Sequence, residues 1–335
     1  MRCLCLVLAL SSADGAPADS APKLPPREKA LITEAYTLWS AVANEIWPGT
    51  SSLKAPLIYV AEQHEYAIGF QRSLEGFTDT RDSVVGMSVQ VRNRSFALDL
   101  SASFPVQGIP AVVMGSPEAL GKPLGSWVIT AGHEMFHVFQ SASGSYDKAE
   151  AVRIGPKGDS SWHLTFPFPY DDRDAMRLIH LQGYLVWLAA QSSSQDDAKY
   201  SVGTAVEAAH VYRAYLAHLT GDEKAYRYSQ FQEWNEGVAA YFEYRLAEKA
   251  AAGAYQPTEE YSSLPMFQRY DALWREAYQA RPFLSKHAGR AAKGRTAFYH
   301  LGTGKALALD KVDAGWKKRY FLPGIWLDDL LAAAK

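Results

Sequence analysis

The chain has 335 residues, of which 48% are hydrophobic and 21% are charged, and its formal net charge at pH 7 is -2. This composition is typical of a globular protein with a buried core and argues against disordered and fibrous classes. The near-balanced charge, without a long run of lysines and arginines, argues against nucleic acid and anionic membranes as partners.

The first eighteen residues, MRCLCLVLALSSADGAPA, have the pattern of a signal peptide. A basic residue precedes an apolar run from Cys3 to Leu10, and small residues at 16–18 fit a cleavage site. We therefore expect residues 1–18 to be removed and the protein to be exported, either periplasmic or secreted. The alternative is a frayed N-terminal tail. Because both cysteines lie in this segment, a metal in the mature chain must be bound by histidine and carboxylate side chains.

The predicted elements begin after a proline-rich linker at 19–27, and we expect residues 28–335 to form one domain. Apolar residues at helical spacing predict a helix over 28–47. Short β-branched and aromatic runs then predict a small, mostly antiparallel sheet of four to six strands before residue 126. These runs are 56–62, 65–70, 88–93, 94–100 and 110–115.

From residue 127 onward the pattern is mostly helical. Strands followed by helices are typical of an α+β fold. No segment here has the roughly 18 apolar residues that a membrane-spanning helix needs, so we expect no membrane span. The predicted helices are 127–141, 173–191, 203–219, 223–249, 264–279, 296–310 and 324–334, with Asp172 and Asp222 as N-caps.

The first of these helices, WVITAGHEMFHVFQ at 127–140, contains an HExxH motif. His133 and His137 are four residues apart, so both side chains lie on one face of a helix and can bind one metal ion. Glu134 would lie beside a water at that ion, where it can act as a general base. A chance match is the alternative, so this interpretation needs a third ligand. The apolar flanks predict a buried helix, in which unpartnered polar side chains would be costly.

This motif is typical of zinc metallopeptidases, and a second segment makes the resemblance more specific. WNEGVAAYFE, at 234–243, resembles the segment of gluzincin (peptidase MA-like) enzymes of the aminopeptidase N type in which a glutamate before glycine binds zinc. The resemblance implies that Glu236 is the third ligand of one Zn²⁺ per chain, in a thermolysin-like zincin core. It places Asn235 and Glu243 at supporting positions. The alternative for Glu236 is a solvated acidic stripe paired with Arg245.

Two features of the second segment and its surroundings bear on this assignment. Glu233, Glu236 and Glu243 have the spacing of one helix face, with Gly237 allowing another helix to approach closely. Gln140 lies one turn beyond His137 and is either a supporting residue or a core amide.

The chain departs from the family in the length between the two motifs. Glu236 follows His137 by 99 positions, a longer separation than in the family. This extra length predicts an inserted helical pair within about 145–222. Such an insert would leave the ligand helix in place but reshape the cleft. Glu207 and His210, inside the insert, are expected at the surface.

Two further family features are incomplete. The resemblance implies a tyrosine as oxyanion donor, for which FYHLGTGKA at 298–306 offers Tyr299, with His300 as the fallback, although the family's lysine is missing. The amine-binding glutamate of the aminopeptidases has no counterpart in register within 107–118. Pro110 there predicts an edge strand, or a half-paired one, which could bind a peptide by strand addition.

We therefore expect an exported zinc endopeptidase that acts on a peptide or protein, with Glu134 as general base. The alternatives are an aminopeptidase without the usual amine-binding motif and a non-catalytic zinc-binding or scaffold protein. The presence of Glu134 argues against the latter, because a purely structural site has no use for a base beside the ligands. The remaining histidines lack ligand spacing and are expected in core or surface roles: His64, His163, His180, His210, His218 and His287.

Overall fold

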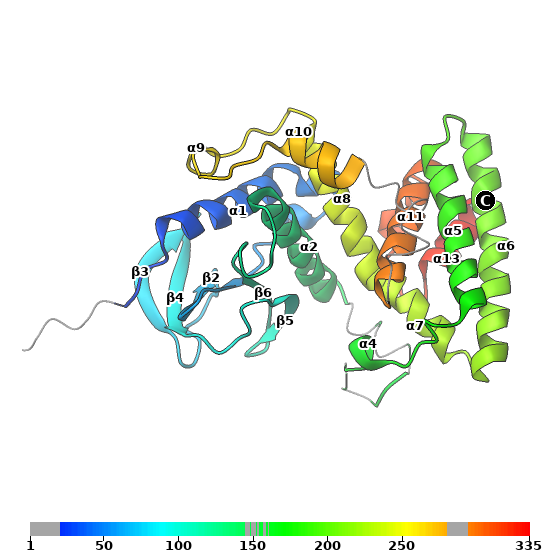
Figure 1. The fold of residues 1–335 in the computed structure, drawn as a ribbon, viewed down its shortest axis with the longest axis horizontal. Helices are drawn as coiled ribbons and strands as arrows, with labels where there is room; N and C mark the ends of the chain where they lie inside the picture. The colour runs from blue at the N-terminus through cyan, green and yellow to red at the C-terminus, as the bar shows by residue number, and fades with distance from the viewer. Residues whose placement is uncertain are drawn as a thin grey trace, which may run out of the picture.

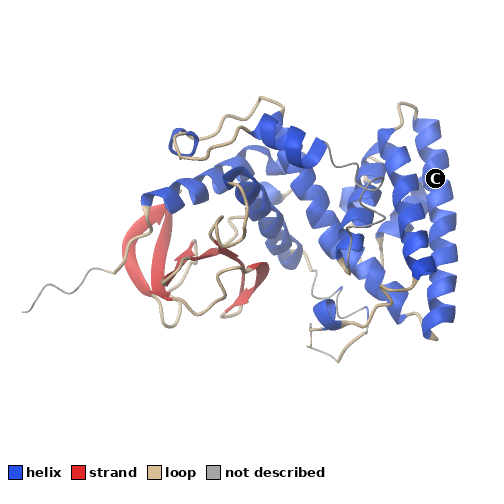
Figure 2. Ribbon diagram, viewed as in Figure 1, coloured by secondary structure: helices blue, strands red, loops and turns tan. Residues whose placement is uncertain are grey.

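A computed structural model describes residues 21–279 and 294–335, except for residues 145–147, 149–151, 153, 157–158 and 160. The expected signal peptide and His287 lie outside the described residues. A six-stranded sheet is followed by a largely helical part, so the predicted α+β class is confirmed (Figures 1 and 2).

Helix α1 (Pro26–Ile46) opens the fold two residues earlier than predicted. Pro26 is well suited to a first helical turn because its missing N–H would have no intrahelical partner there. Arg27 therefore belongs to the helix and not to the predicted linker. Leu24, just before it, is buried, so the packed structure begins ahead of the helix.

The sheet has the strand order β3-β4-β2-β1-β6-β5. Only β1 and β6 run parallel, and the other four neighbouring pairs are antiparallel. The sheet is therefore mixed, within the predicted range of four to six strands. The strands are β1 (Leu57–Val60), β2 (His64–Ile68), β3 (Thr78–Val84), β4 (Met87–Asn93), β5 (Ser101–Val106) and β6 (Ile109–Gly115).

Two strands were not predicted, and one predicted strand is wrong. Residues 94–100 form a loop because the buried carboxylate of Glu65 accepts the backbone N–H groups of Ser95 and Phe96, which turns the chain. The strand follows this loop as β5. The polar β3, TDTRDSV, lacked an apolar pattern and contains an irregularity between Asp79 and Asp82.

Pro110 does not mark an edge strand, but its strand is half-paired at this residue, which was the other outcome that Pro110 predicted. Its strand, β6, pairs with β1 on one side and β5 on the other. The pairing with β1 starts at Val112, so the missing N–H of Pro110 interrupts no bond on that side. The edge strands of the described sheet are β3 and β5, and β5 precedes β6 in the chain.

The helical part contains the predicted helices with shifted bounds. The long helices are α2 (Leu124–Ala142), α5 (Arg173–Gln191), α6 (Gln195–Thr220), α7 (Lys224–Gln232), α8 (Val238–Ala251) and α11 (Thr296–Val312); a π-helical turn, η2 (Glu233–Gly237), joins α7 to α8. Shorter ones are η1 (Thr50–Ser52), α4 (Trp162–Thr165), α9 (Glu259–Ser262), α10 (Tyr270–Leu273), η3 (Trp274–Gln279), α12 (Trp316–Arg319) and α13 (Leu327–Ala334).

Some of these bounds correct the predictions. Helix α6 starts eight residues before the predicted 203, capped by Ser194. The predicted helix 264–279 begins only at Tyr270. Asp172 caps α5 as predicted, by accepting two backbone N–H groups. Helix α7 has Glu223 at its N-cap, while Asp222 accepts the N–H of Lys224.

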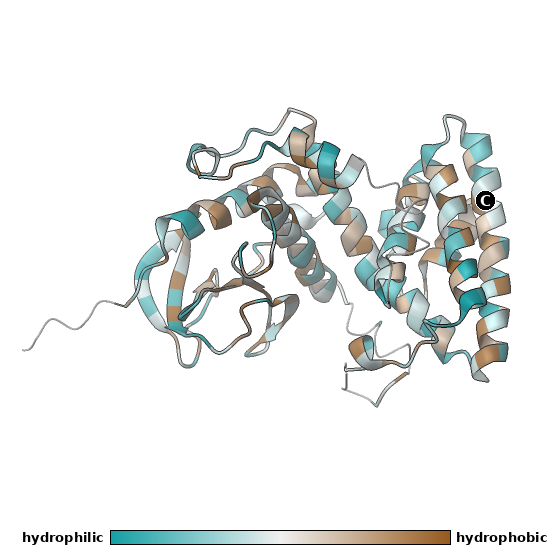
Figure 3. Cartoon of the chain, in the orientation of Figure 1, coloured by the Kyte–Doolittle hydropathy of each residue, from teal (hydrophilic) through white to brown (hydrophobic). Residues whose placement is uncertain are grey.

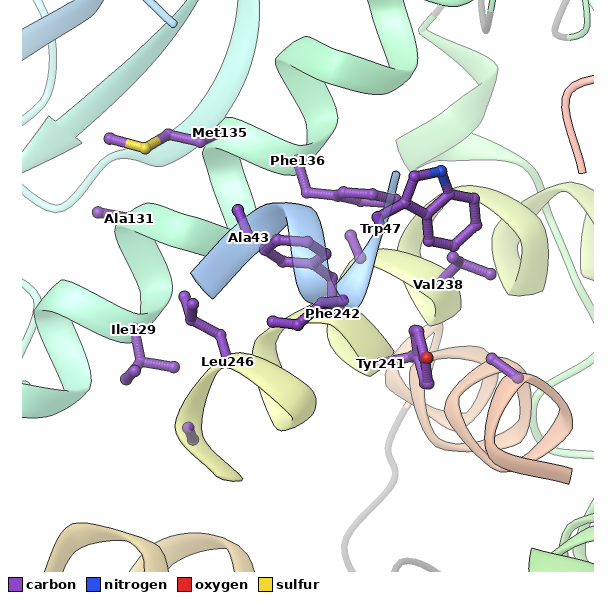
Figure 4. Packing of buried hydrophobic residues seen from close by; sticks show 14 of the residues in the cluster. Ala43, Trp47, Ile129, Ala131, Met135, Phe136, Val238, Tyr241, Phe242 and Leu246 are labelled. Atoms are coloured by element: carbon purple, nitrogen blue, oxygen red, sulfur yellow. The ribbon is translucent and has the colours of Figure 1, made fainter. Parts of the chain in front are cut away.

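The main core lies where α1, α2 and α8 cross beside the sheet (Figure 4). Phe136 of α2 stacks on Phe242 of α8, with 4.7 Å between the ring centroids. Trp47 packs edge-on against Phe136, with 5.1 Å between their ring centroids. Gly132 allows the close approach, since a Cβ there would lie 2.2 Å from a methyl carbon of Leu246. The opposite face of the sheet has a smaller apolar cluster of its own.

The remaining long helices form a second group away from the sheet, in which α5 and α6 pack on each other and α5 also packs on α11 (Figure 1). Hydrophilic and hydrophobic residues alternate along α5 and α6 in Figure 3, as expected for helices with one packed and one exposed side. Glu207 and His210 of α6 are exposed, as predicted. In the described part of the chain, no helix is long and apolar enough to cross a membrane.

Candidate metal centre

His133, His137 and Glu236 lie together, and they can hold a metal ion. The Nε2 atoms of the two histidines are 3.1 Å apart, and Glu236 Oε2 lies 3.4 Å from Nε2 of His137 and 4.0 Å from Nε2 of His133. A tetrahedral zinc ion with ligands at about 2.0–2.1 Å has ligand–ligand distances of roughly 3.3 Å. The three donor atoms therefore have nearly the spacing that such an ion requires.

Helix α2 supplies both histidines from one turn to the next, because residues four apart share a face. His133 is only 7% exposed and Glu134 only 6%, as expected from the apolar flanks of the motif. A buried, tightly packed helix fixes the positions of these side chains before any ligand arrives.

Glu236 comes from the π-helical turn η2, whose i→i+5 pairing adds a residue to the turn. Its neighbour Glu233 therefore does not share its face, contrary to the prediction. Glu233 is buried against α11, where the ammonium of Lys305 lies 2.6 Å from its carboxylate and also pairs with Asp328. Gly237 follows Glu236 and contacts the backbone of Gly302.

Glu243 lies behind the first histidine, His133. Its Oε2 is 3.1 Å from Nδ1 of His133, and Tyr278 donates a hydrogen bond of 2.7 Å to its Oε1. Burial opposes charge on both groups, but their mutual attraction outweighs it. The pKa of His133 is raised to about 9, and that of Glu243 is lowered to about 2.

Gln140 holds the second histidine. Its Nε2 donates to the carbonyl of Asn235 at 3.0 Å and to the hydroxyl of Tyr320 at 2.7 Å. The amide oxygen of Gln140 must then accept from Nδ1 of His137, 2.7 Å away. With the proton fixed on Nδ1, the Nε2 lone pair of His137 is free to bind a metal. Asn235 contributes its backbone carbonyl to this arrangement and also lines the cleft.

Glu134 lies beside the three ligands without belonging to them. The hydroxyl of Ser101, in the edge strand β5, donates a hydrogen bond of 3.0 Å to Glu134 Oε1. No sequence pattern pointed to Ser101, because a lone serine in a short strand carries no motif. This contact brings the edge strand β5 next to the expected general base.

Tyr299 and Arg295 of the α11 segment reach Glu236 from the other side. Arg295 Nη1 lies 3.4 Å from Glu236 Oε1, and the Tyr299 hydroxyl hydrogen-bonds to the same carboxylate. Burial raises the pKa of Glu236, but His137, His133 and Tyr299 outweigh burial and hold it well below its usual value. Burial and the charge of Glu236 raise the pKa of Tyr299, so its phenol keeps its proton.

A cleft of about 510 Å³ opens over the three ligands, and it is lined by residues of β5, α2, α4, α7, η2, α8 and α11 and of the turn before α2. Tyr299 is among the lining residues, whereas His300, the fallback donor, is not. His163, which was expected in a core or surface role, also lines the cleft. It comes from the expected insert, and its Nε2 is buried with no hydrogen-bond partner among the described residues.

No family model, curated protein or solved structure matches the chain. The functional argument therefore depends on the chemistry of this site.

Proposed function

We propose that the protein is a zinc-dependent peptidase with a gluzincin-like catalytic core. The observation that supports this most is the convergence of three ligands, a neighbouring carboxylate and an open cleft. His133 and His137 with Glu236 form a two-histidine, one-carboxylate set, which is typical of catalytic zinc sites that keep a fourth position open. A closed structural site would have no need of Glu134 or of a cleft.

Each residue has a distinct part in the proposed reaction. A bound zinc ion would polarise the scissile carbonyl and lower the pKa of a water molecule. Glu134 would accept the proton of the attacking water and pass it to the leaving amine. Tyr299, whose phenol stays protonated, would donate a hydrogen bond to the oxyanion as it develops.

The edge strand β5 supports a polypeptide as the substrate. Its residues Ser101 to Phe104 line the cleft, and its outer edge has no partner strand in the described sheet. An extended peptide can pair with such an edge and present its carbonyl groups to the ligands. The cleft-lining part of β5 carries no acidic residue for a free amine, so we favour endopeptidase activity.

The proposal is tested by metal analysis and peptide cleavage on the same preparation. Purified protein should bind one zinc ion and cleave an unfolded protein in a chelator-sensitive reaction. Glu134→Gln should keep the zinc but lose about 10²- to 10⁴-fold in kcat. His133→Ala should lose the zinc as well. Glu45→Gln, an exposed change on α1, is the matched control.

Two results would contradict the proposal. If His133→Ala retained stoichiometric zinc, the ion would be bound elsewhere. If zinc-loaded protein left every peptide of a broad library intact, the site would be a binding or scaffold site.

A further inference from the structure

The charged residues of the cleft show an imbalance. Five charged side chains line it besides the histidines: Lys122, Glu134, Glu236, Glu243 and Arg295. Each of the three carboxylates has a partner within the site. Glu134 accepts a hydrogen bond from Ser101, Glu243 contacts His133, and Glu236 pairs with Arg295. A divalent ion and Arg295 together would offset the three negative charges. Lys122 then adds a positive charge that nothing else in the lining balances.

Lys122 is held in place by its backbone. It lies in the turn between β6 and α2, where its N–H donates to the carbonyl of Pro117 at 2.9 Å. The neighbouring N–H of Gly121 donates to Glu118, and α2 begins two residues later, at Leu124. The side chain is half-buried, and among the described residues it has no ion-pair partner.

We infer that Lys122 is a specificity-determining residue that selects a carboxylate of the peptide substrate near the scissile bond. This inference rests on the proposed peptidase function and extends it to a class of substrate. Attraction between Lys122 and a substrate carboxylate strengthens binding, whereas a lysine or arginine at the same place is repelled. The carboxylate belongs either to an internal Asp or Glu or to the C-terminus of a short peptide.

In the test, the zinc-loaded protein first cleaves a second protein that has been unfolded and chemically blocked. The bonds cleaved in this substrate are mapped by mass spectrometry. Three quenched peptides are then built around one cleaved bond, with Glu, Gln or Lys at the position where acidic residues are enriched. We expect kcat/KM to fall about three- to fivefold at each step from Glu to Gln to Lys. A parallel pair with a free or amidated C-terminus distinguishes the two sources of the carboxylate.

The variants assign the preference to one side chain. Lys122→Gln should remove the preference for Glu over Lys, and Lys122→Glu should reverse it. Lys199→Gln, an exposed change on α6 outside the cleft, is the matched control and should keep it. The same ranking should appear in the Kd of labelled peptides for Glu134→Gln, measured by fluorescence anisotropy, and should weaken with added salt.

The outcomes separate this inference from the proposed function. If peptides are cleaved but the rate is indifferent to charge, or if both Lys122 variants keep the wild-type preference, Lys122 has no such role and the peptidase proposal stands. If the zinc-loaded protein neither cleaves nor binds any peptide, the proposed function fails, and the specificity fails with it.

Discussion

At the residue scale, hydrogen-bond partners restrict the orientation of the polar side chains around the three ligands. Gln140 shows this best, because three oxygen atoms surround its Nε2 and force its Oε1 toward His137. An amide in this orientation determines which imidazole nitrogen carries the proton. The HExxH pattern predicted the ligands, but it did not predict this support, since Gln140 was equally compatible with a core role.

The ionisation of His163 should make the free energy of unfolding depend measurably on pH. Burial lowers its pKa to about 4, only partly opposed by the charge of Glu236. In the unfolded chain a histidine has a pKa of about 6.5, so between these values the unfolded state binds more protons. The free energy of unfolding should therefore fall as the pH drops from about 6.5 to about 4, and this loss is complete below the lower value.

Replacing His163 tests this linkage. His163→Gln and His163→Phe should each reduce the stability lost between pH 6.5 and 4 by about 1–2 kcal/mol relative to wild type, a value discounted for the partial exposure of the ring. Urea unfolding of metal-free protein at several pH values measures the difference. Parallel curves for wild type and both variants would show that His163 does not remain neutral in the folded state.

At the element scale, the π-helical turn is the feature that the sequence pattern could not reveal. The apolar spacing over 223–249 predicted one continuous helix, and the structure follows that path with one turn widened at η2. The widened turn directs Glu236 to the histidines and Glu233 to Lys305. A periodicity argument assumes one rotation per residue, so it placed both glutamates on the same face.

The glycines beside this turn carry a prediction. A Cβ at Gly237 would lie 2.5 Å from the Cα of Gly302, a backbone atom that cannot move aside without shifting α11. Gly237→Ala should therefore destabilise the protein by about 1–3 kcal/mol, as overpacking does, and weaken zinc binding by displacing Glu236. Gly203→Ala is the matched control, since nothing lies within 4 Å of its new Cβ in α6. This control should stabilise the protein by up to about 1 kcal/mol.

Urea unfolding and chelator competition on the two glycine variants check both parts of this prediction. Equal effects of the two changes on stability would mean that the contact between α11 and the π turn is looser than the structure shows. Wild-type zinc affinity in a destabilised Gly237→Ala would mean that η2 does not position the ligand.

The sheet was predicted where its strands are mostly buried and missed where they are more exposed. Strands β1, β2, β4 and β6 are mostly buried and contain β-branched or aromatic residues, which is the pattern that the prediction used. Strand β5 is half-exposed, has serines at 101 and 103 and contains Pro105, as an edge strand can. The strand that lines the cleft was therefore one of the two that the sequence pattern missed.

At the scale of the whole molecule, the site joins segments that are distant in the chain. Helix α2 packs against the sheet, whereas η2 packs against α11 in the helical group (Figure 1). The ligand motifs were visible from the sequence because each is a local pattern. Arg295, His163 and Ser101 were not, because only the folding of separate segments brings them to the cleft.

This placement predicts that zinc stabilises the whole fold. An ion that binds only the folded state adds about 4 kcal/mol when its free concentration is a thousand times its Kd. In a protein of 335 residues each kcal/mol raises Tm by roughly 1.5 °C, so zinc should raise the Tm of metal-free protein by roughly 6 °C. Calorimetry with buffered zinc measures the shift, and His133→Ala and Glu236→Ala should each abolish it. A shift that survives Glu236→Ala but not His133→Ala would restrict the ion to α2, and the two groups of helices would then not be joined through the metal.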